Sequence, residues 1–279
     1  MKRSISLLVA LGVASTTMWA GAALAEPVHK AFAQIAAGSA AKVDHAQWDR
    51  LLKTYVQVGA DGINRVAYAR FKAEAHDQLK GYIAQLEGVT VATLDRSEQF
   101  AFWANLYNAK TIEIVLQKYP VASIKDISLG GGLIASVKGG PWAAKVVKVS
   151  GQDLSLDDIE HGIMRRVFKD PRVHYAVNCA ALGCPNLIPE AFVGERLEQQ
   201  LDAAARAFIN SSRGARNADG RIQASSIYNW FQSDFGGNAQ GVVSHLQQYA
   251  EPELKQALEK SSAGGGLSYE YDWRLNDAK

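Results

Sequence analysis

Cysteine is scarce in this sequence: Cys179 and Cys184 are the only two among 279 residues. Two cysteines allow one intramolecular disulfide, which excludes the densely bridged folds of small secreted proteins. An excess of either charge is also missing, because 30 Lys and Arg residues face 28 Asp and Glu residues. A chain with a net charge of +2 gives no reason to expect a nucleic-acid partner.

Long apolar runs are absent after the first residues of the chain. Residues 1–25 join two basic residues to a short apolar stretch and end in the small-x-small pattern Ala23-Leu24-Ala25. This pattern is typical of a secretory signal peptide, and it predicts cleavage near Ala25 and a periplasmic or secreted protein. Residues 26–279 are then expected to form a single globular domain without a membrane span.

Apolar periodicity predicts a mainly helical chain. The segment 95–119 is the most regular, because Asp95 and Glu98 have the spacing of a helix-capping pair and Pro120 ends the helix. Apolar side chains occupy nearly all of its faces, which predicts a buried central helix. Other helices are predicted at residues 29–41, 44–55, 68–86, 155–168, 195–210, 226–231, 239–249 and 252–260.

Strand signals are few and lie scattered among the helices. They predict extended segments at residues 63–66, 145–149, 173–177 and 269–273. No unit of solenoid or propeller length repeats along the chain. The expected fold class is therefore α+β, a predominantly helical single domain with a small β-sheet.

Cofactor motifs are not recognisable. The glycine-rich segment 121–142 lacks the Gly-Lys-Ser/Thr ending of a phosphate-binding loop, so it is predicted to be a loop over a cleft. The C-x4-C spacing of Cys179 and Cys184 is looser than the C-x2-C of zinc knuckles and thioredoxin-like sites. No cofactor and no metal site are therefore expected.

Four motifs occur in a fixed order along the chain. They are FWANLYNA (102–109), LSLDDIEHGIMR (154–165), DPRVHYAVNCAALGCPNL (170–187) and YDWRLN (271–276). Together they resemble the family called domain of unknown function 547, over roughly residues 97–276. The family has bacterial and eukaryotic members and no assigned reaction, so the resemblance implies a shared fold and leaves the function open.

The two cysteines have two competing interpretations. In an oxidising compartment, neighbouring thiols pair, and a five-residue separation permits a disulfide between Cys179 and Cys184. Alternatively, Cys179 follows the predicted strand 173–177 and begins a turn whose N–H groups activate it as a nucleophile. The interpretations exclude each other, because a bridged cysteine has no thiolate with which to attack.

Two histidines are candidate bases for Cys179. On a regular strand, residues an odd number apart face opposite sides, so a direct His174–Cys179 pair requires the strand to end or bulge. His161 has Asp157 four residues before it on the same helical face, where the carboxylate can orient it. The alternatives are a solvated His161 and a buried His174 that hydrogen-bonds to the backbone.

Polar residues complete the candidate site. Glu160 is expected at the edge of the core, either in an ion pair with Arg165 or in the site. Asn105 and Asn108 share a face of the central helix, where they either hold loops in place or line a cleft. The predicted catalytic set is Cys179, His174, His161 and Glu160, and the predicted substrate-binding set is Asn105, Asn108, Asn178 and Cys184.

Two functions from different classes fit these residues. One is a thiol-dependent hydrolase or acyl transferase that acts on an amide or peptide-like substrate. The alternative is a non-catalytic binding or scaffold module of the cell envelope, with a Cys179–Cys184 disulfide. Trp230 and Trp273 are predicted to pack in the core rather than to stack on a ligand. The partner is expected to be a small-molecule or peptide-like ligand, and the oligomeric state is not predicted.

Overall fold

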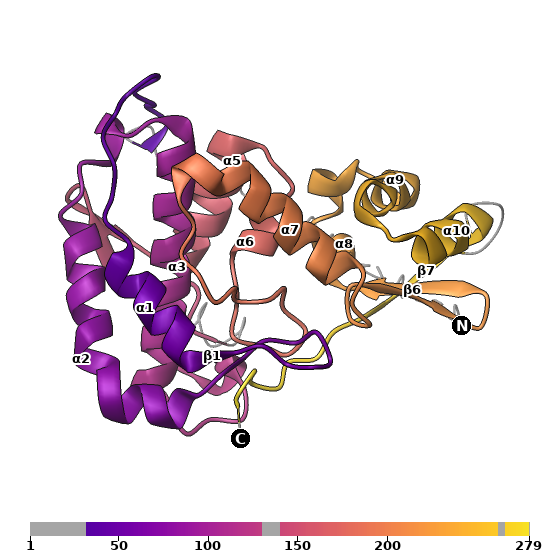
Figure 1. The fold of residues 1–279 in the computed structure, drawn as a ribbon, viewed down its shortest axis with the longest axis horizontal. Helices are drawn as coiled ribbons and strands as arrows, with labels where there is room; N and C mark the ends of the chain where they lie inside the picture. Colours follow the sequence, from indigo (N-terminus) through magenta and orange to yellow (C-terminus); the bar gives the residue numbers. More distant parts are fainter. Residues whose placement is uncertain (1–31, 130–139, 262–265, 279) are drawn as a thin grey trace, which may run out of the picture.

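The computed structural model describes residues 32–129, 140–261 and 266–278 (Figure 1). The predicted signal peptide and the middle of the glycine-rich segment lie outside these ranges. The predicted helix 29–41 is wrong where it can be compared, because residues 33–41 form turns and irregular backbone. Gly38 has a φ of 75°, a left-handed conformation that ends helices.

Three helices form a helical lobe around the larger hydrophobic core. They are α1 (Ala46–Tyr55), α2 (Tyr68–Glu87) and α3 (Arg96–Lys118). As predicted, the Asp95 side chain caps α3 by accepting a hydrogen bond from Glu98 N. Buried residues cover nearly every face of α3, so this helix is the centre of the lobe (Figure 1). The short strands β1 (Val56–Gln57) and β2 (Arg65–Val66) connect α1 to α2.

The predicted helix 155–168 forms, with an irregularity that the periodicity does not reveal. Its middle is a π-helix, η4 (Asp158–Met164), which continues into α5 (Arg165–Phe168). The backbone N–H of Arg165 donates to the carbonyl of Glu160, five residues earlier. This wider turn often occurs at functional sites. A hairpin of β3 (Val147–Val149) and β4 (Gln152–Leu154) precedes the helix.

The predicted strand 173–177 is wrong, since residues Val173–Ala176 form the short helix α6. Asp170 accepts a hydrogen bond from the backbone N–H of Arg172, and Pro171 lies in the turn that leads into α6. These helix-start signals override the β-branched and aromatic residues that favour a strand. The face-parity argument against a His174–Cys179 pair therefore does not apply to this segment.

The second part of the chain, the small lobe, has its own hydrophobic core. Its helices are α7 (Leu197–Ile209), α8 (Ile227–Trp230), α9 (Ala239–Tyr249) and α10 (Pro252–Ser261). Its sheet has the order β5 (Ala215–Ala218), β6 (Arg221–Ser225), β7 (Leu267–Glu270). Strands β5 and β6 are antiparallel, whereas β6 and β7 are parallel. Short 3-10 helices complete the chain: η2 (Val91–Thr93), η3 (Ile124–Asp126), η5 (Gly194–Arg196) and η6 (Gln232–Phe235).

The predicted strand 269–273 ends early, and the residues after it become a connecting tail, residues 271–278. The tail runs from β7 back to the helical lobe (Figure 1). It forms a bridge between Asp277 and Val66 of β2, and another between Leu275 and Ala181. Both lobes therefore share a segment that passes beside the two cysteines.

These elements confirm the predicted fold class, α+β with mostly helices and small sheets. Within the three described ranges, no helix is long and apolar enough to cross a membrane.

Candidate functional site

A pocket of about 660 Å³ lies where α3, the π-helix η4, α6, α8 and the tail meet. Tyr107 of α3, Glu160 and His161 of η4, and His174 of α6 contribute side chains to its wall. Both cysteines also line it. The predicted catalytic set, Cys179, His174, His161 and Glu160, is thus brought to one pocket by three separate elements. A concave, mainly apolar cavity with a few polar groups is typical of small-molecule sites.

Aromatic side chains form one wall of the pocket. Trp230 stacks on Trp273 with ring centroids 5.7 Å apart, and Tyr271 lies 4.8 Å from Trp230. Trp142 meets Trp273 edge-on at 5.8 Å. Trp230 remains 46% exposed, a large value for an indole that packs against others. The prediction that Trp230 and Trp273 are core residues is therefore wrong: both line the pocket.

Acidic and imidazole side chains line the pocket together with these rings. His161 Nε2 lies 3.8 Å from Asp157 Oδ1, as expected from their spacing on one helical face. His161 Nδ1 lies 3.7 Å from Glu160 Oε1. The same Glu160 oxygen lies 3.8 Å from His174 Nδ1, so Glu160 sits between two imidazoles. This arrangement can pass a proton between a bound ligand and the histidines.

Asp234 is not among the residues that line the pocket, but it holds His174 in place. His174 Nε2 donates to Asp234 Oδ2 at 2.8 Å, and Arg165 Nε donates to the same oxygen at 2.5 Å. Burial raises the pKa of Asp234, but the bonds from His174 and Arg165 outweigh it and hold the pKa well below its usual range. The predicted ion pair between Glu160 and Arg165 therefore does not form. Arg165 pairs with Asp234, and Glu160 lies beside His161 and His174.

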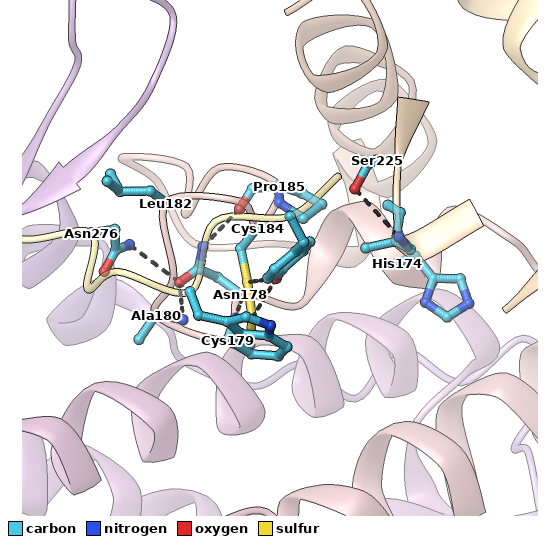
Figure 2. Close-up of a disulfide and its surroundings, with 12 residues drawn as sticks. His174, Asn178, Cys179, Ala180, Leu182, Cys184, Pro185, Ser225 and Asn276 are labelled. Carbon is cyan, nitrogen blue, oxygen red and sulfur yellow. Dashed lines mark hydrogen bonds between the residues drawn. A yellow bond between two sulfur atoms is a disulfide. The ribbon is translucent and has the colours of Figure 1, made fainter. Parts of the chain in front are cut away.

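The cysteines are joined in a disulfide, with Sγ atoms 2.01 Å apart. Neither presents a thiolate in this state. The backbone N–H of Cys179 donates to Cys184 Sγ at 3.0 Å, and the Tyr271 hydroxyl lies 3.0 Å and 3.1 Å from the two sulfur atoms. In Figure 2 the His174 imidazole points away from the disulfide, so the predicted His174–Cys179 dyad does not form.

The three asparagines of the predicted substrate-binding set serve the backbone instead of a ligand. Asn105 is fully buried and exchanges two hydrogen bonds with the backbone of Phe192. Asn108 donates to the carbonyl of Ala176 and accepts from Asn178 N. None of the three is among the residues that line the pocket. A buried amide satisfies its polar atoms with such bonds, so these side chains hold the neighbouring backbone in place.

Asn178 braces both ends of the loop that carries the disulfide (Figure 2). Its side-chain oxygen accepts from Ala180 N at 2.9 Å, and its amide nitrogen donates to the carbonyl of Pro185 at 2.7 Å. Ala180 has a φ of 60°, the left-handed conformation that this short side chain-to-backbone turn stabilises. Asn178, which Asn108 holds by its backbone N–H, therefore positions the loop that carries Cys179 and Cys184.

Two tyrosine hydroxyls stay protonated at the pocket. Burial raises the pKa of Tyr271 far above its usual value, and the Glu160 carboxylate raises it further. Burial likewise raises the pKa of Tyr107, which also faces Glu160. Both phenols therefore act as hydrogen-bond donors and not as bases.

Fold and site together define an α+β protein with an aromatic and acidic pocket that a disulfide closes on one side. Residues 91–209 match the family described as "Protein of unknown function, DUF547". The match confirms the resemblance drawn from the motifs, three of which fall inside it. No curated protein and no solved structure matches the chain.

Sequence reasoning did not identify Asp234, Trp142 or Tyr271 as parts of the site. Asp234 lies 60 residues from His174, so no local spacing connects them. Tyr271 and Trp273 were assigned to a regular strand, where alternation would place them on a half-buried face. The YDWRLN motif was the available signal, because two large aromatics beside a charged pair are unusual in a strand that only packs.

Proposed function

We propose that the pocket binds a small organic cation, a molecule that carries an ammonium or guanidinium group on an apolar body. The observation that carries this proposal is the lining of the pocket. It combines a group of aromatic rings with the carboxylates of Asp157 and Glu160. Among the described residues that line the pocket, none is Lys or Arg.

Aromatic faces attract cations electrostatically, and the contribution grows where water is excluded. The protein's own cations already contact two rings that line the pocket, Trp273 and Phe231. Lys125 Nζ lies 5.0 Å from the centroid of Trp273, and the Arg165 guanidinium lies 4.8 Å from that of Phe231. These contacts support the proposal that the pocket rings accept a positive group.

The carboxylates give the cation its orientation. Glu160 is only 12% exposed at its side chain and lies beside Tyr107. A positive group bound to Glu160 would have its apolar body in a pocket that Trp230 and Trp273 also line. A ligand of drug-like size fits a cavity of this volume.

A ligand series tests the proposal. Benzylamine and benzyltrimethylammonium are titrated against the protein with tryptophan emission as the readout, beside neutral benzyl alcohol and anionic phenylacetate. We expect both cations to bind at least about tenfold more tightly than the other two, since a charged pair contributes about 1.4 kcal/mol or more. Equal affinity for phenylacetate and benzylamine would contradict a cation site.

Two matched variants locate the binding. Glu160→Gln is expected to weaken benzylamine about tenfold, because the neutral amide keeps the shape and removes the charge. Glu253→Gln, on the exposed start of α10, serves as the control and should leave the affinity unchanged. Far-UV circular dichroism checks that both variants fold. An unchanged affinity in Glu160→Gln would remove this carboxylate from the site.

A thiol-dependent hydrolase or acyl transferase for amide or peptide-like substrates is the second candidate. It is favoured by one observation, that Cys179 shares the pocket with Glu160, His161 and His174. Because the disulfide leaves no thiolate, this activity would belong to the reduced protein alone. A nitrophenyl ester tests it: turnover by reduced protein, lost in Cys179→Ser, supports the activity, and no turnover in either refutes it.

Export to the periplasm or the exterior is part of the proposal. It is supported by the signal-peptide pattern of residues 1–25 and agrees with a disulfide. Intact mass of the protein isolated from its host tests it, with a new N-terminus after Ala25 as the expected result. A full-length chain in the cytosol would refute export.

A further inference from the structure

The two sulfur atoms of the disulfide have different surroundings. Cys184 is buried, with 2% of its surface exposed, whereas Cys179 is partly exposed in the pocket wall. A thiol that enters the pocket therefore meets Cys179 first. Thiol–disulfide exchange proceeds by attack on one sulfur while the other leaves, so this difference assigns Cys184 as the leaving sulfur.

Hydrogen-bond donors are arranged around the sulfur that would leave. The backbone N–H of Cys179 lies 3.0 Å from Cys184 Sγ, and the Tyr271 hydroxyl lies 3.1 Å from it and 3.0 Å from Cys179 Sγ. Because Tyr271 keeps its proton, its hydroxyl donates to sulfur. A disulfide sulfur is a weak acceptor that gains little from two donors, whereas a thiolate is a strong one.

A buried positive charge lies at the same loop. Arg213 donates to the carbonyls of Leu182 and Cys184 and to the side-chain oxygen of Asn186. These three acceptors are neutral, so they do not cancel the charge, and Arg213 Nε has no hydrogen-bond partner. Burial lowers the pKa of Arg213 to about 10, which still leaves it cationic at neutral pH. Arg213 contacts the carbonyl of Cys184, so its charge would favour a thiolate on that residue.

We propose that the Cys179–Cys184 disulfide is a thiol–disulfide exchange site that oxidises dithiols entering the aromatic pocket. One thiolate of the dithiol attacks Cys179 Sγ, the bond between the cysteines breaks, and its electron pair leaves on Cys184 Sγ. The Cys179 N–H and the Tyr271 hydroxyl hold the resulting thiolate.

The second thiol of the substrate completes the exchange. After losing its proton, it attacks the substrate sulfur of the mixed disulfide, and Cys179 leaves and takes up a proton. The dithiol is oxidised to a disulfide and gives up two electrons, which reduce the protein's disulfide to Cys179 thiol and Cys184 thiolate. The remaining proton passes to solvent. This inference goes beyond cation binding, because it depends on the surroundings of the two sulfur atoms and not on a bound cation. The C-x4-C spacing alone does not predict a thiol–disulfide exchange site.

Reduction of the folded, oxidised chain by dithiothreitol tests the proposal. Without denaturant at neutral pH, thiols are blocked with iodoacetamide at set times, and intact mass gives the reduced fraction. We expect the wild type to be reduced much faster than it unfolds. Tyr271→Phe should react at least about tenfold more slowly, because the leaving thiolate loses a donor. Tyr269→Phe, a neighbour on β7 that does not touch sulfur, should react at the wild-type rate.

Two outcomes would overturn the proposal in this assay. One is reduction of the wild type no faster than global unfolding, measured by tryptophan emission. The other is an equal rate for Tyr271→Phe and Tyr269→Phe. Benzylamine affinity is measured separately, so a failure of cation binding and a failure of exchange are distinguishable.

Single-cysteine variants test the order of attack independently of Tyr271. Cys184→Ser leaves Cys179 as a free thiol, and Cys179→Ser leaves Cys184. Each is mixed with 2-hydroxyethyl disulfide, and mass spectrometry follows formation of the mixed disulfide. Cys184 carries more of its sulfur as thiolate in this proposal, but only 2% of its surface is exposed, so the reagent cannot reach it. We therefore expect faster modification of Cys179, by at least about tenfold. Faster modification of Cys184 would reverse the roles and overturn the assignment.

Discussion

Two buried histidines make the stability of this protein depend on pH. His45 packs beside Tyr82 in the helical lobe, and His245 packs beside Tyr175 in the small lobe. Burial lowers the pKa of each from 6.5 to about 4. Between these values the unfolded chain binds more protons than the folded one. The free energy of unfolding is therefore full above about pH 7 and falls as the pH decreases toward 4.

The size of the effect follows from the two pKa values. A histidine whose pKa falls from 6.5 to about 4 on folding contributes about 3 kcal/mol that is lost well below pH 4. Between pH 7 and pH 5 each imidazole accounts for about 2 kcal/mol of that loss. Carboxylates held at low pKa, such as Asp234, stay ionised over this interval and add little. The wild type should therefore lose about 4 kcal/mol between pH 7 and pH 5.

The variant His245→Gln isolates one of the two contributions. The glutamine amide can donate to the Tyr175 hydroxyl but does not titrate. Urea unfolding followed by tryptophan emission should show a loss of about 2 kcal/mol between pH 7 and pH 5 in the variant. Between pH 7 and pH 8 both imidazoles are neutral, so the two proteins should then run parallel. Equal losses at pH 5 would refute the assignment of His245 as a buried neutral histidine.

The structure also predicts the effects of three further substitutions. Asn105→Ala leaves the N–H and C=O of Phe192 buried and unpaired, and urea unfolding should show a loss of about 3 kcal/mol; a loss below 1 kcal/mol would argue against these bonds. Gly183→Ala would place Cβ 2.8 Å from Asp272 N, which should move the tail. We expect benzylamine to bind several-fold more weakly to this variant. An unchanged affinity would show that the tail tolerates the shift. Arg172→Met removes ion pairs with three carboxylates and should lower stability by about 1–2 kcal/mol in low salt and by less in high salt.

The sequence predicted the elements whose signals are local. The central helix is an example, because its cap at Asp95, its apolar faces and its stop at Pro120 all lie within one segment. The hairpin of β5 and β6 was not predicted, because its strands are short and partly polar and give no clear alternation of apolar residues. Residues 173–177 were assigned the wrong structure because Val173 and Tyr175 favour strands, while Asp170 and Pro171 start a helix.

The candidate site was only half predictable, for a physical reason. Its catalytic candidates lie within 154–187, where motif and spacing point to them. Their partners Asp234 and Tyr271 come from distant parts of the chain, and only the packing of the two lobes brings them near. Whether residues 26–279 unfold as one domain stays a prediction, and a single urea transition in the wild type would support it.

The position of the tail at the end of the described chain determines the order in which the parts of the site are made. Tyr271 follows Cys179 by 92 residues and Cys184 by 87, so a ribosome exposes the thiols long before it releases their hydroxyl partner. Until the tail docks, Tyr271 does not lie against the two sulfur atoms, so an oxidant has freer access to them. Once the tail docks across β2 and the disulfide loop, the same sulfurs are reached only through the pocket. The disulfide therefore forms while its sulfur atoms are accessible to any oxidant, whereas in the folded protein only molecules that enter the pocket can exchange with it.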